Sequence, residues 1–261
     1  MQTTIDGTKI AYDDVGNGPA IVLIHGFPLD RTIWNPQLEA LRANARVIVP
    51  DLRGAGESAR GADGPVLMEA LASDLAGLLD TLGIERAIVV GHSIGSYVAF
   101  AFFRMYAERV AGFGLVAGHP AADTPDLLPL RDALAERLEC GDITPAIEAY
   151  LPRYLDPAGA PVLTELLRAI MTRQDARGAA ALVRGMKERV AAHDLLPDIT
   201  VPATIVAGES DSWIAPDSLR AAAQQMGNAE FVRLPDVGHL PMLEAPQATT
   251  AALARLIERC R

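Results

Sequence analysis

Apolar residues along this chain gather in short continuous runs that are bounded by turn residues. A continuous run, unlike an alternation of apolar and polar residues, is typical of a strand buried on both faces of a parallel sheet. Residues 3–15, with a turn at Gly7, predict a hairpin at one edge of that sheet. The runs lie at residues 21–24, 47–49, 87–90, 113–117 and 203–207, with a weaker one at 230–234.

Between these runs the apolar positions recur at the spacing of a helix. Leucines at this spacing occupy residues 67–79, and Gly83 marks the end of the helix predicted over residues 65–82. Strands that alternate with helices predict an α/β fold with a doubly wound, mostly parallel sheet and right-handed crossovers.

The pattern changes in residues 119–192. This stretch contains no strand-like run, and four apolar stripes with helical spacing follow one another instead. Thr124-Pro125 and Thr144-Pro145 each pair an N-cap candidate with a proline suited to the first helical position. These two pairs therefore predict two of the helix starts.

Length and composition fit one domain with an insertion. The chain has 261 residues, of which 50% are hydrophobic, and this is enough for a large core. We expect an α/β core made of residues 1–118 and 193–261. Residues 119–192 are then a helical cap, or lid, inserted between two strands of the core.

The charge balance and the cysteines limit the partners and the location. A net charge of −10 argues against nucleic acid or an anionic membrane as partner. No apolar run reaches the length of about 18 residues that a transmembrane helix needs. The first residues lack the parts of a signal peptide, and Cys140 and Cys260 are too few for a disulfide framework. These features predict a cytoplasmic protein with free thiols, whereas the oligomeric state stays open.

The strongest chemical signal is Gly91-His92-Ser93-Ile94-Gly95, which joins an apolar run to a helical stretch. A strand, a tight turn and a helix around Gly-x-Ser-x-Gly form a nucleophile elbow. The turn strains the backbone of the serine, and the flanking glycines lack the Cβ atoms that would clash. Ser93 is therefore the candidate nucleophile, at a helix N-terminus that favours developing negative charge.

A serine hydroxyl needs a base to become a good nucleophile. Of the five histidines, His239 fits this role best, because it lies beside a glycine in a loop after the last strand-like run. The base needs an acid to orient it, and Asp211 follows the preceding run. Asp236 is too close in sequence to His239 for the usual geometry, whereas Asp123 remains a rival for the acid.

The candidates occur in the order Ser93, Asp211, His239, which is the order of α/β-hydrolases. The chain resembles serine hydrolases of the α/β-hydrolase fold over essentially its whole length. The cap is similar to that of bacterial carboxylesterases with a helical lid, and also resembles the 3-oxoadipate enol-lactonase group. Besides the elbow, the matching motifs are His25-Gly26-Phe27-Pro28, the run Asp51-Leu52-Arg53-Gly54-Ala55-Gly56-Glu57-Ser58, Gly208-Glu209-Ser210-Asp211 and Gly238-His239.

The resemblance implies a reaction and its remaining parts. The oxyanion hole is expected to consist of the backbone N–H groups of Ile94, after the nucleophile, and of Phe27. The expected reaction is hydrolysis of a small-molecule carboxylic ester or lactone through an acyl-enzyme, without a metal or an organic cofactor. Haloalkane dehalogenases and epoxide hydrolases share the His-Gly-x-Pro loop but have Asp at the elbow, so Ser93 favours attack on a carbonyl group.

Three alternatives use the same scaffold. A lactonase would open a cyclic ester with the same triad, and a perhydrolase would use peroxide in place of water at the acyl-enzyme. A ligand-binding receptor would keep the scaffold with slow turnover or none. Residues 54–59 also fit a dinucleotide-binding pattern, but no helix start follows them, so the bound phosphate would lack its helix N-terminus.

Other residues are weaker candidates for contact with the substrate. Trp213 and Met242 flank the predicted acid and base, and His119 and Trp34 lie near predicted functional loops. The cap is rich in arginines, most of which are expected on solvated helix faces, although one of them could bind a substrate carboxylate. His25 and His92 are expected to make structural contacts and to move no proton.

Overall fold

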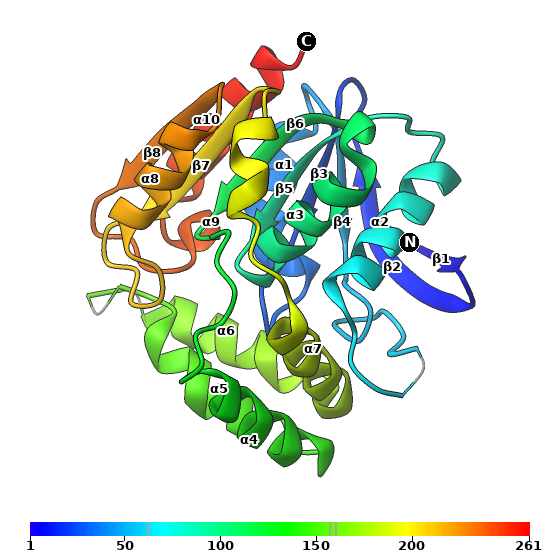
Figure 1. The fold of residues 1–261 in the computed structure, drawn as a ribbon, viewed down its shortest axis with the longest axis vertical. Coiled ribbons are helices and arrows are strands. Elements are labelled where there is room, and N and C mark those ends of the chain that lie inside the picture. The colour runs from blue at the N-terminus through cyan, green and yellow to red at the C-terminus, as the bar shows by residue number, and fades with distance from the viewer. Residues whose placement is uncertain (62, 157, 160) are drawn as a thin grey trace.

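An eight-stranded sheet forms the centre of the molecule (Figure 1). The computed structural model describes residues 1–61, 63–156, 158–159 and 161–261. The strands are β1 (Gln2–Ile5), β2 (Thr8–Val15), β3 (Ala20–Ile24), β4 (Arg46–Pro50), β5 (Ala87–His92), β6 (Val110–Val116), β7 (Ala203–Gly208) and β8 (Ala229–Leu234). Their order across the sheet is β1-β2-β4-β3-β5-β6-β7-β8. Strand β2 is antiparallel to both its neighbours and the other pairs are parallel, which confirms the predicted sheet and edge hairpin.

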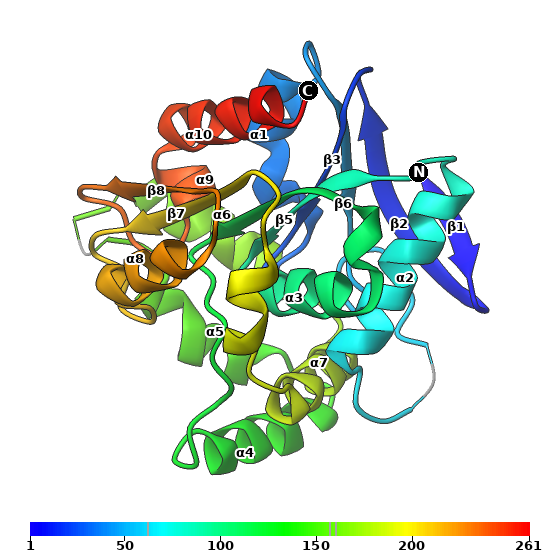
Figure 2. The ribbon, with the colours of Figure 1, turned by 45° about the horizontal axis from the view of Figure 1, so that its top comes forward.

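Helices cover both faces of the sheet (Figure 2). One face carries α1 (Asn35–Leu41) and α10 (Pro246–Arg259), and the other carries α2 (Met68–Thr81), α3 (Ile94–Tyr106) and α8 (Pro216–Gln225). The short helical turns outside the cap segment are η1 (Arg31–Trp34), η2 (Ala107–Arg109), η4 (His193–Asp198) and α9 (Pro241–Glu244). With both faces covered, strand β5 is buried along its whole length, as its continuous apolar run predicts.

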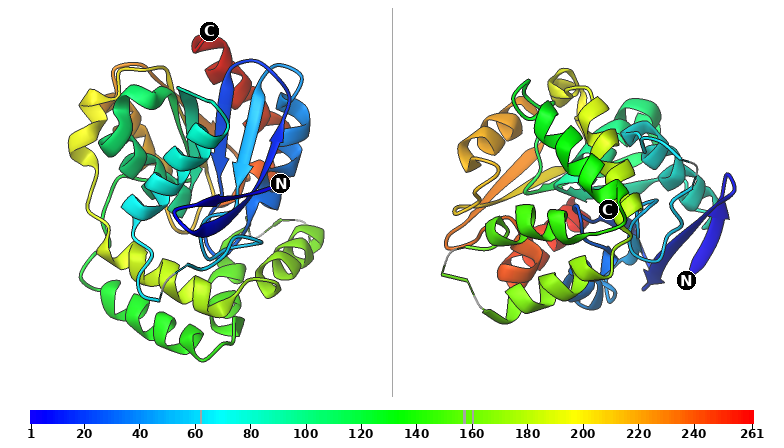
Figure 3. Two further views of the ribbon diagram at one scale, coloured as in Figure 1. Left: turned by 90° about the vertical axis from the view of Figure 1, so that its right-hand side faces the viewer. Right: turned by 90° about the horizontal axis from the view of Figure 1, so that it is seen from below.

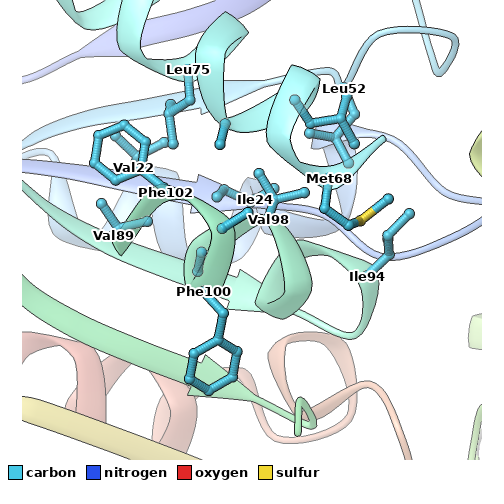
Figure 4. Close-up of a cluster of buried hydrophobic side chains, with 14 of the residues drawn as sticks. Val22, Ile24, Leu52, Met68, Leu75, Val89, Ile94, Val98, Phe100 and Phe102 are labelled. Atoms are coloured by element: carbon cyan, nitrogen blue, oxygen red, sulfur yellow. The ribbon is translucent and has the colours of Figure 1, made fainter. Parts of the chain in front are cut away.

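The layer between the sheet and helices α2 and α3 is apolar and closely packed (Figure 4). Val22 of β3 and Val89 of β5 belong to one buried cluster with Leu75 of α2 and Phe102 of α3. Complete burial of a side chain of this size contributes about 1.5–3 kcal/mol. The cluster therefore holds the end of β5 and the start of α3 in a rigid frame.

Residues 119–192, which we call the cap segment, leave the sheet after β6 and return to it before β7. Their helices lie at the lower end of the molecule in Figure 1 and face the viewer in the right panel of Figure 3. The described residues of this segment form no strand, as the sequence predicts. The helical elements of the segment are α4 (Leu128–Glu139), α5 (Thr144–Tyr150), η3 (Leu151–Arg153), α6 (Pro161–Thr172) and α7 (Ala176–Glu188).

Helix α2 begins later than its apolar stripe predicts. The prediction starts the helix at Pro65, but the helix begins at Met68. The N–H of Val66 donates a hydrogen bond to the carbonyl of Ala181 in α7, at 3.0 Å. This contact with the cap segment uses a backbone group just before the helix, and local sequence cannot reveal it.

Two predicted helix starts in the cap segment are wrong by one to a few residues. The carbonyl of Thr124 accepts the N–H of Leu127 at 2.9 Å in a separate turn, and α4 begins only at Leu128. Thr144 lies inside α5, and its N–H donates to the carboxylate of Asp142 at 2.9 Å. Asp142 rather than Thr144 therefore supplies the capping oxygen. None of the helices that the structure describes is both long and apolar enough to cross a membrane.

Candidate active site

Ser93 occupies the sharp turn between β5 and α3, so the strand, turn and helix predicted here are confirmed. Its backbone has φ 51° and ψ −117°, a conformation that residues other than glycine rarely adopt. A Cβ atom on Gly91 would collide with the carbonyl group of Gly95, and one on Gly95 would collide with the carbonyl of Ile24. Both glycines are therefore required for the chain to bring Ser93 to the end of β5 in this conformation.

The predicted base and acid are hydrogen-bonded to each other. Nδ1 of His239 lies 2.8 Å from Oδ2 of Asp211, and the two side chains are only 4% and 1% exposed. The other carboxylate oxygen of Asp211 accepts the N–H groups of Trp213 at 2.8 Å and Ile214 at 3.2 Å. Because Nδ1 faces a carboxylate, the neutral ring carries its proton there and leaves Nε2 as the basic atom.

The rival acid Asp123 lies in a different set of contacts. Its carboxylate pairs with Arg131 at 3.0 Å and with Arg189 at 2.8 Å. Among the described residues, Asp211 is thus the carboxylate that bonds His239, as the sequence favours.

The loop that carries His239 is fixed by hydrogen bonds on both sides. The N–H of His239 donates to the carbonyl of Tyr154 at 2.7 Å, and the two rings stack with centroids 5.8 Å apart. The carboxylate of Glu244 accepts the N–H groups of Gly238 and Leu240, each at 3.0 Å. The ring of the candidate base is therefore held by its backbone as well as by Asp211.

His92, next to Ser93, also contacts the backbone of this loop. Nε2 of His92 lies 2.9 Å from the carbonyl oxygen of His239, and the ring centroids are 5.0 Å apart. A carbonyl oxygen only accepts, so Nε2 carries the proton and donates it. Burial, together with the neighbouring His239, lowers the pKa of His92 well below its ordinary value. His92 is therefore a neutral ring that ties the nucleophile turn to the base loop.

The side chain of Ser93 makes no hydrogen bond to the part of the chain that the structure describes. Hydrogen bonds between catalytic groups are often long in free enzymes and shorten when substrate binds. His92, the neighbour of Ser93 in the chain, has its ring centroid 5.0 Å from that of His239, so the nucleophile turn and the base loop are adjacent.

The loop after β3 carries the predicted oxyanion donor Phe27. The N–H of Leu52 donates to Nε2 of His25 at 2.9 Å, so Nδ1 of His25 carries the proton and donates to the carbonyl of Gly26 at 2.8 Å. His25 therefore supports this loop, as expected. The N–H groups of Phe27 and Ile94 donate to no acceptor within the described residues, and Ile94 lies in the first helical turn, where such groups are free.

Three aromatic side chains, Phe27, Tyr150 and Trp213, pack together beside the candidate base, and we call them the aromatic wall. The ring of Tyr150, from the cap segment, stacks on Trp213 with centroids 5.0 Å apart, and the Trp213 ring lies 6.3 Å from that of His239. Phe27 meets Tyr150 edge to face at 5.2 Å. Arg153 lies 3.8 Å above the Trp213 ring, a favourable arrangement for a cation. The sequence singles out Trp213 but misses Tyr150, which looks like an ordinary member of a helical stripe.

The other weak candidates separate into two groups. His119 and Trp213 line a cleft of about 390 Å³ between the first residues of the cap segment and α8. Trp34 and Met242 are fully buried in the apolar cluster under α1 and α10, and neither lines this cleft. Their burial favours a role in core packing over contact with substrate.

Comparisons with known proteins agree with this fold. A sequence profile described as the alpha/beta hydrolase family matches residues 21–253. A putative carbamate hydrolase of Caulobacter is 28% identical over 97% of this chain and 97% of its own. Among solved structures, a thermophilic esterase from Thermogutta terrifontis, with malate bound, has 38% identity and a TM-score of 0.95 over 99% of this chain and 97% of its own. The enol-lactonase from Burkholderia xenovorans LB400 has 28% identity and a TM-score of 0.90 over 99% of this chain and 100% of its own.

Proposed function

Because this chain belongs to the alpha/beta hydrolase family, we propose that it is a serine hydrolase that cleaves carboxylic esters with Ser93, His239 and Asp211. The observation that carries the proposal is the 2.8 Å hydrogen bond between His239 and Asp211, together with the strained backbone of Ser93 in the turn after β5. Nucleophile, base and orienting acid in this chain order are the parts that acyl transfer requires. The esterase from Thermogutta terrifontis, at 38% identity, supports ester hydrolysis.

In the first half of the proposed reaction, Oγ of Ser93 attacks the ester carbonyl carbon while Nε2 of His239 takes its proton. Asp211 stabilises the imidazolium that forms and keeps Nδ1 protonated. The negative oxygen of the tetrahedral intermediate accepts hydrogen bonds from the N–H groups of Phe27 and Ile94. The bond to the alcohol oxygen then breaks, His239 returns its proton to that oxygen, and the acyl group stays on Ser93.

In the second half, water replaces the alcohol. His239 removes a proton from the water as its oxygen attacks the acyl carbon, and the same N–H groups hold the second oxyanion. Collapse of this intermediate breaks the bond to Ser93, and His239 gives the proton back to Oγ. The acid leaves and the protein returns to its starting state.

The test is hydrolysis of p-nitrophenyl esters of increasing chain length by the wild type, Ser93→Ala and the control Ser73→Ala. Ser73 lies in α2 and donates to the carbonyl of Glu69, so it provides a serine outside the proposed machinery. Removing the nucleophile lowers kcat by about 10⁶-fold in a serine protease, and we expect a loss of that order for Ser93→Ala only. A loss of only a few fold in Ser93→Ala would reject the mechanism. Ligand-induced stabilisation of the wild type without any turnover would favour a binding protein instead.

A lactonase is the second candidate. Two solved structures support it, the 28% identical enol-lactonase and an N-acyl homoserine lactone degrading enzyme with 26% identity over 98% of this chain. A lactone is a cyclic ester, so Ser93 would attack it in the same way and the leaving alcohol would stay attached to the acyl group. The ratio of kcat/KM for a lactone to that for a linear ester of equal carbon number distinguishes the two candidates.

A further inference from the structure

A short piece of the cap segment, residues 153–156, is bonded to each of the three loops that carry the candidate catalytic groups, and we call it the anchor. On the side of the acid, Nη2 of Arg153 donates to the carbonyl of Ser212 at 2.8 Å, and the hydroxyl of Ser212 donates to the carbonyl of Arg153 at 3.1 Å. Ser212 directly follows Asp211 in the chain. The anchor is therefore fixed to the loop of the candidate acid.

The anchor is also attached to the loop of the candidate base. The carbonyl of Tyr154 accepts the N–H of His239 at 2.7 Å, and the N–H of Asp156 donates to the carboxylate of Glu244 at 2.7 Å. A Cβ atom on Gly238 would lie 2.6 Å from the backbone nitrogen of Asp156 and 2.9 Å from the carbonyl oxygen of Tyr154. The glycine beside the base is therefore needed for the close approach of the two backbones.

The third attachment of the anchor reaches the loop of the oxyanion donor. The hydroxyl of Tyr154 donates to the carbonyl oxygen of Phe27, and no other donor within the described residues bonds this oxygen. Burial raises the pKa of Tyr154 well above its ordinary value, so the hydroxyl keeps the proton that it donates. The Tyr154 side chain is buried, and its ring stacks on that of His239. One side chain thus contacts both the base and the residue that carries the oxyanion donor.

The bond from Tyr154 completes the support of Phe27. The carbonyl of Gly26, which shares a peptide plane with the N–H of Phe27, accepts Nδ1–H of His25 at 2.8 Å and the N–H of Leu29 at 3.1 Å. The carbonyl on the other side of Phe27 is held by Tyr154. A turn of the Phe27 N–H away from its direction would therefore break a buried hydrogen bond on one side or the other.

Packing alone does not require the hydroxyl of Tyr154. The ring belongs to a buried apolar cluster with Leu151, Val237 and Leu240, and a phenylalanine would fill nearly the same volume there. Burying a hydroxyl is unfavourable unless it is hydrogen-bonded, and the acceptor here is the carbonyl of Phe27. The polar atom of this side chain therefore serves the bond to the oxyanion loop.

We propose that Tyr154 is a positioning residue that holds the base His239 and the oxyanion donor Phe27 at a fixed separation from each other. This inference rests on the proposed ester hydrolysis and assigns one more residue to it. The base and the oxyanion donor act on the same carbonyl group in the same step, so their separation has to match the substrate. A displacement of about 1 Å in such an arrangement costs about 10²-fold in rate. Tyr154 acts through these two residues and forms no bond with the substrate in this role.

The first test compares Tyr154→Phe with Tyr106→Phe in the hydrolysis of p-nitrophenyl esters. Tyr154→Phe keeps the ring against His239 and removes only the bond to Phe27. We expect kcat to fall about 10- to 100-fold with KM nearly constant, because a displaced oxyanion donor weakens binding of the transition state and not of the ester. The control removes a hydroxyl that lies 3.3 Å from Ser73, where α3 meets α2. An unchanged kcat in Tyr154→Phe, or an equal loss in both variants, would overturn the proposal.

A pair of ketones distinguishes positioning from a general loosening of the site. Oγ of Ser93 adds to the carbonyl carbon of trifluoromethyl hexyl ketone, the proton passes to Nε2 of His239, and the ketone oxygen becomes an oxyanion without a leaving group to depart. Methyl hexyl ketone has the same chain but is not activated for this addition. We expect the Ki of the trifluoromethyl ketone to rise in Tyr154→Phe by the factor by which kcat/KM falls, while that of the methyl ketone stays constant. An equal loss of affinity for both ketones would overturn the positioning role.

Hydrogen exchange and a second variant cover the other outcomes. If the wild type hydrolyses no ester, the proposed function fails, and Tyr154→Phe should still speed the exchange of the N–H of His239, whose acceptor is the carbonyl of Tyr154. Unchanged exchange at that N–H would overturn the proposal. If Tyr154→Phe does not fold, Glu244→Gln decides, because an amide nitrogen cannot accept the N–H groups of Gly238 and Asp156 that one carboxylate oxygen accepts. This variant should lower kcat at nearly constant KM, and full activity would overturn the proposal.

Discussion

The two sides of the candidate active site differ in how completely their hydrogen-bond donors and acceptors are paired. On the core side, both oxygens of Asp211 are used, Nδ1 of His239 is bonded to one of them, and the backbone of His239 is bonded at N–H and at C=O. On the side that faces the cap segment, which we call the cap side, Tyr97 of α3, Tyr150 of α5 and Trp213 hold donors for which no described residue is the acceptor. In our account the satisfied side and the anchor serve the reaction, whereas the unsatisfied side is left free to select the substrate.

The difference also lies in what holds each side in place. The core side depends on backbone groups at the ends of parallel strands, and these positions follow from the fold itself. The cap side depends on bonds between side chains of separate helices, such as that between Arg131 and Tyr150. Substitutions on the core side or in the anchor should therefore change the rate with every ester, whereas those on the cap side should change the preference among esters.

The largest expected effect is the difference in kcat between Asp211→Asn and Asp123→Asn. An amide at 211 cannot hold the base in its tautomer, and the matching change in a serine protease lowers kcat by about 10⁴-fold. Asn at 123 leaves the bond between His239 and Asp211 intact, so turnover of p-nitrophenyl esters should largely persist. Steady-state kinetics of both variants decides, and the reverse order of losses would remove Asp211 from its assigned role.

A smaller loss of kcat on the core side is expected when the backbone carbonyl of His239 loses the hydrogen bond that His92 donates to it. His92→Phe leaves the carbonyl of His239 without its 2.9 Å partner, and an unsatisfied buried carbonyl costs about 1–3 kcal/mol. We expect kcat to fall about tenfold or more with KM nearly constant. His92→Gln keeps an N–H donor and should recover part of kcat, and no difference between the two variants would mean that His92 acts by packing alone.

On the cap side, Tyr97→Phe removes one hydroxyl donor. The N–H of Ala121 donates to Nδ1 of His119 at 3.1 Å, so the neutral ring donates from Nε2 to the hydroxyl of Tyr97 at 3.0 Å and leaves that hydroxyl its own proton. The preference for p-nitrophenyl methoxyacetate over p-nitrophenyl butyrate, an ester of the same length without the ether oxygen, is expected to fall about two- to tenfold, since one neutral hydrogen bond is lost. The control is Tyr106→Phe, because the hydroxyl of Tyr106 lies 3.3 Å from Ser73, where α3 meets α2. If both variants shift the preference alike, the free hydroxyl of Tyr97 has no part in selection.

The smallest effect concerns stability and pH. His119 has a pKa of about 4 in the folded protein against 6.5 ordinarily, so the unfolded chain takes up its proton first as pH falls. The free energy of unfolding should therefore decrease from about pH 6.5 toward pH 4, with His92 acting in the same direction. His119→Gln should show a weaker decrease in urea unfolding between about pH 7 and pH 5. An unchanged decrease would assign the pH dependence to other groups.

The core side could be predicted from sequence because each of its parts lies in a local motif at a strand end. Ser93 is marked by its glycines, and Asp211 and His239 follow strand-like runs, so the fold alone brings them together. The short apolar runs likewise predict the sheet, because burial on both faces leaves a direct trace in the sequence.

The cap side could not be predicted in this way. Arg131 and Arg189 belong to a segment rich in arginines, and nothing local separates a buried guanidinium from a solvated one. Their burial depends on Asp123, which the sequence suggests only as a rival acid. The helix starts in the cap segment failed for a related reason, because Asp142 supplies a cap that the Thr-Pro pattern assigns to Thr144.

The most direct test of the account is covalent labelling with diisopropyl fluorophosphate, followed by intact-mass measurement and peptide mapping. An activated serine attacks phosphorus as it attacks a carbonyl carbon, fluoride leaves, and a stable ester forms. We predict one adduct per chain, mapped to Ser93, absent in Ser93→Ala and formed much more slowly in Asp211→Asn. An adduct at another residue, or equal labelling of Ser93→Ala, would contradict the assignment of Ser93 as the nucleophile.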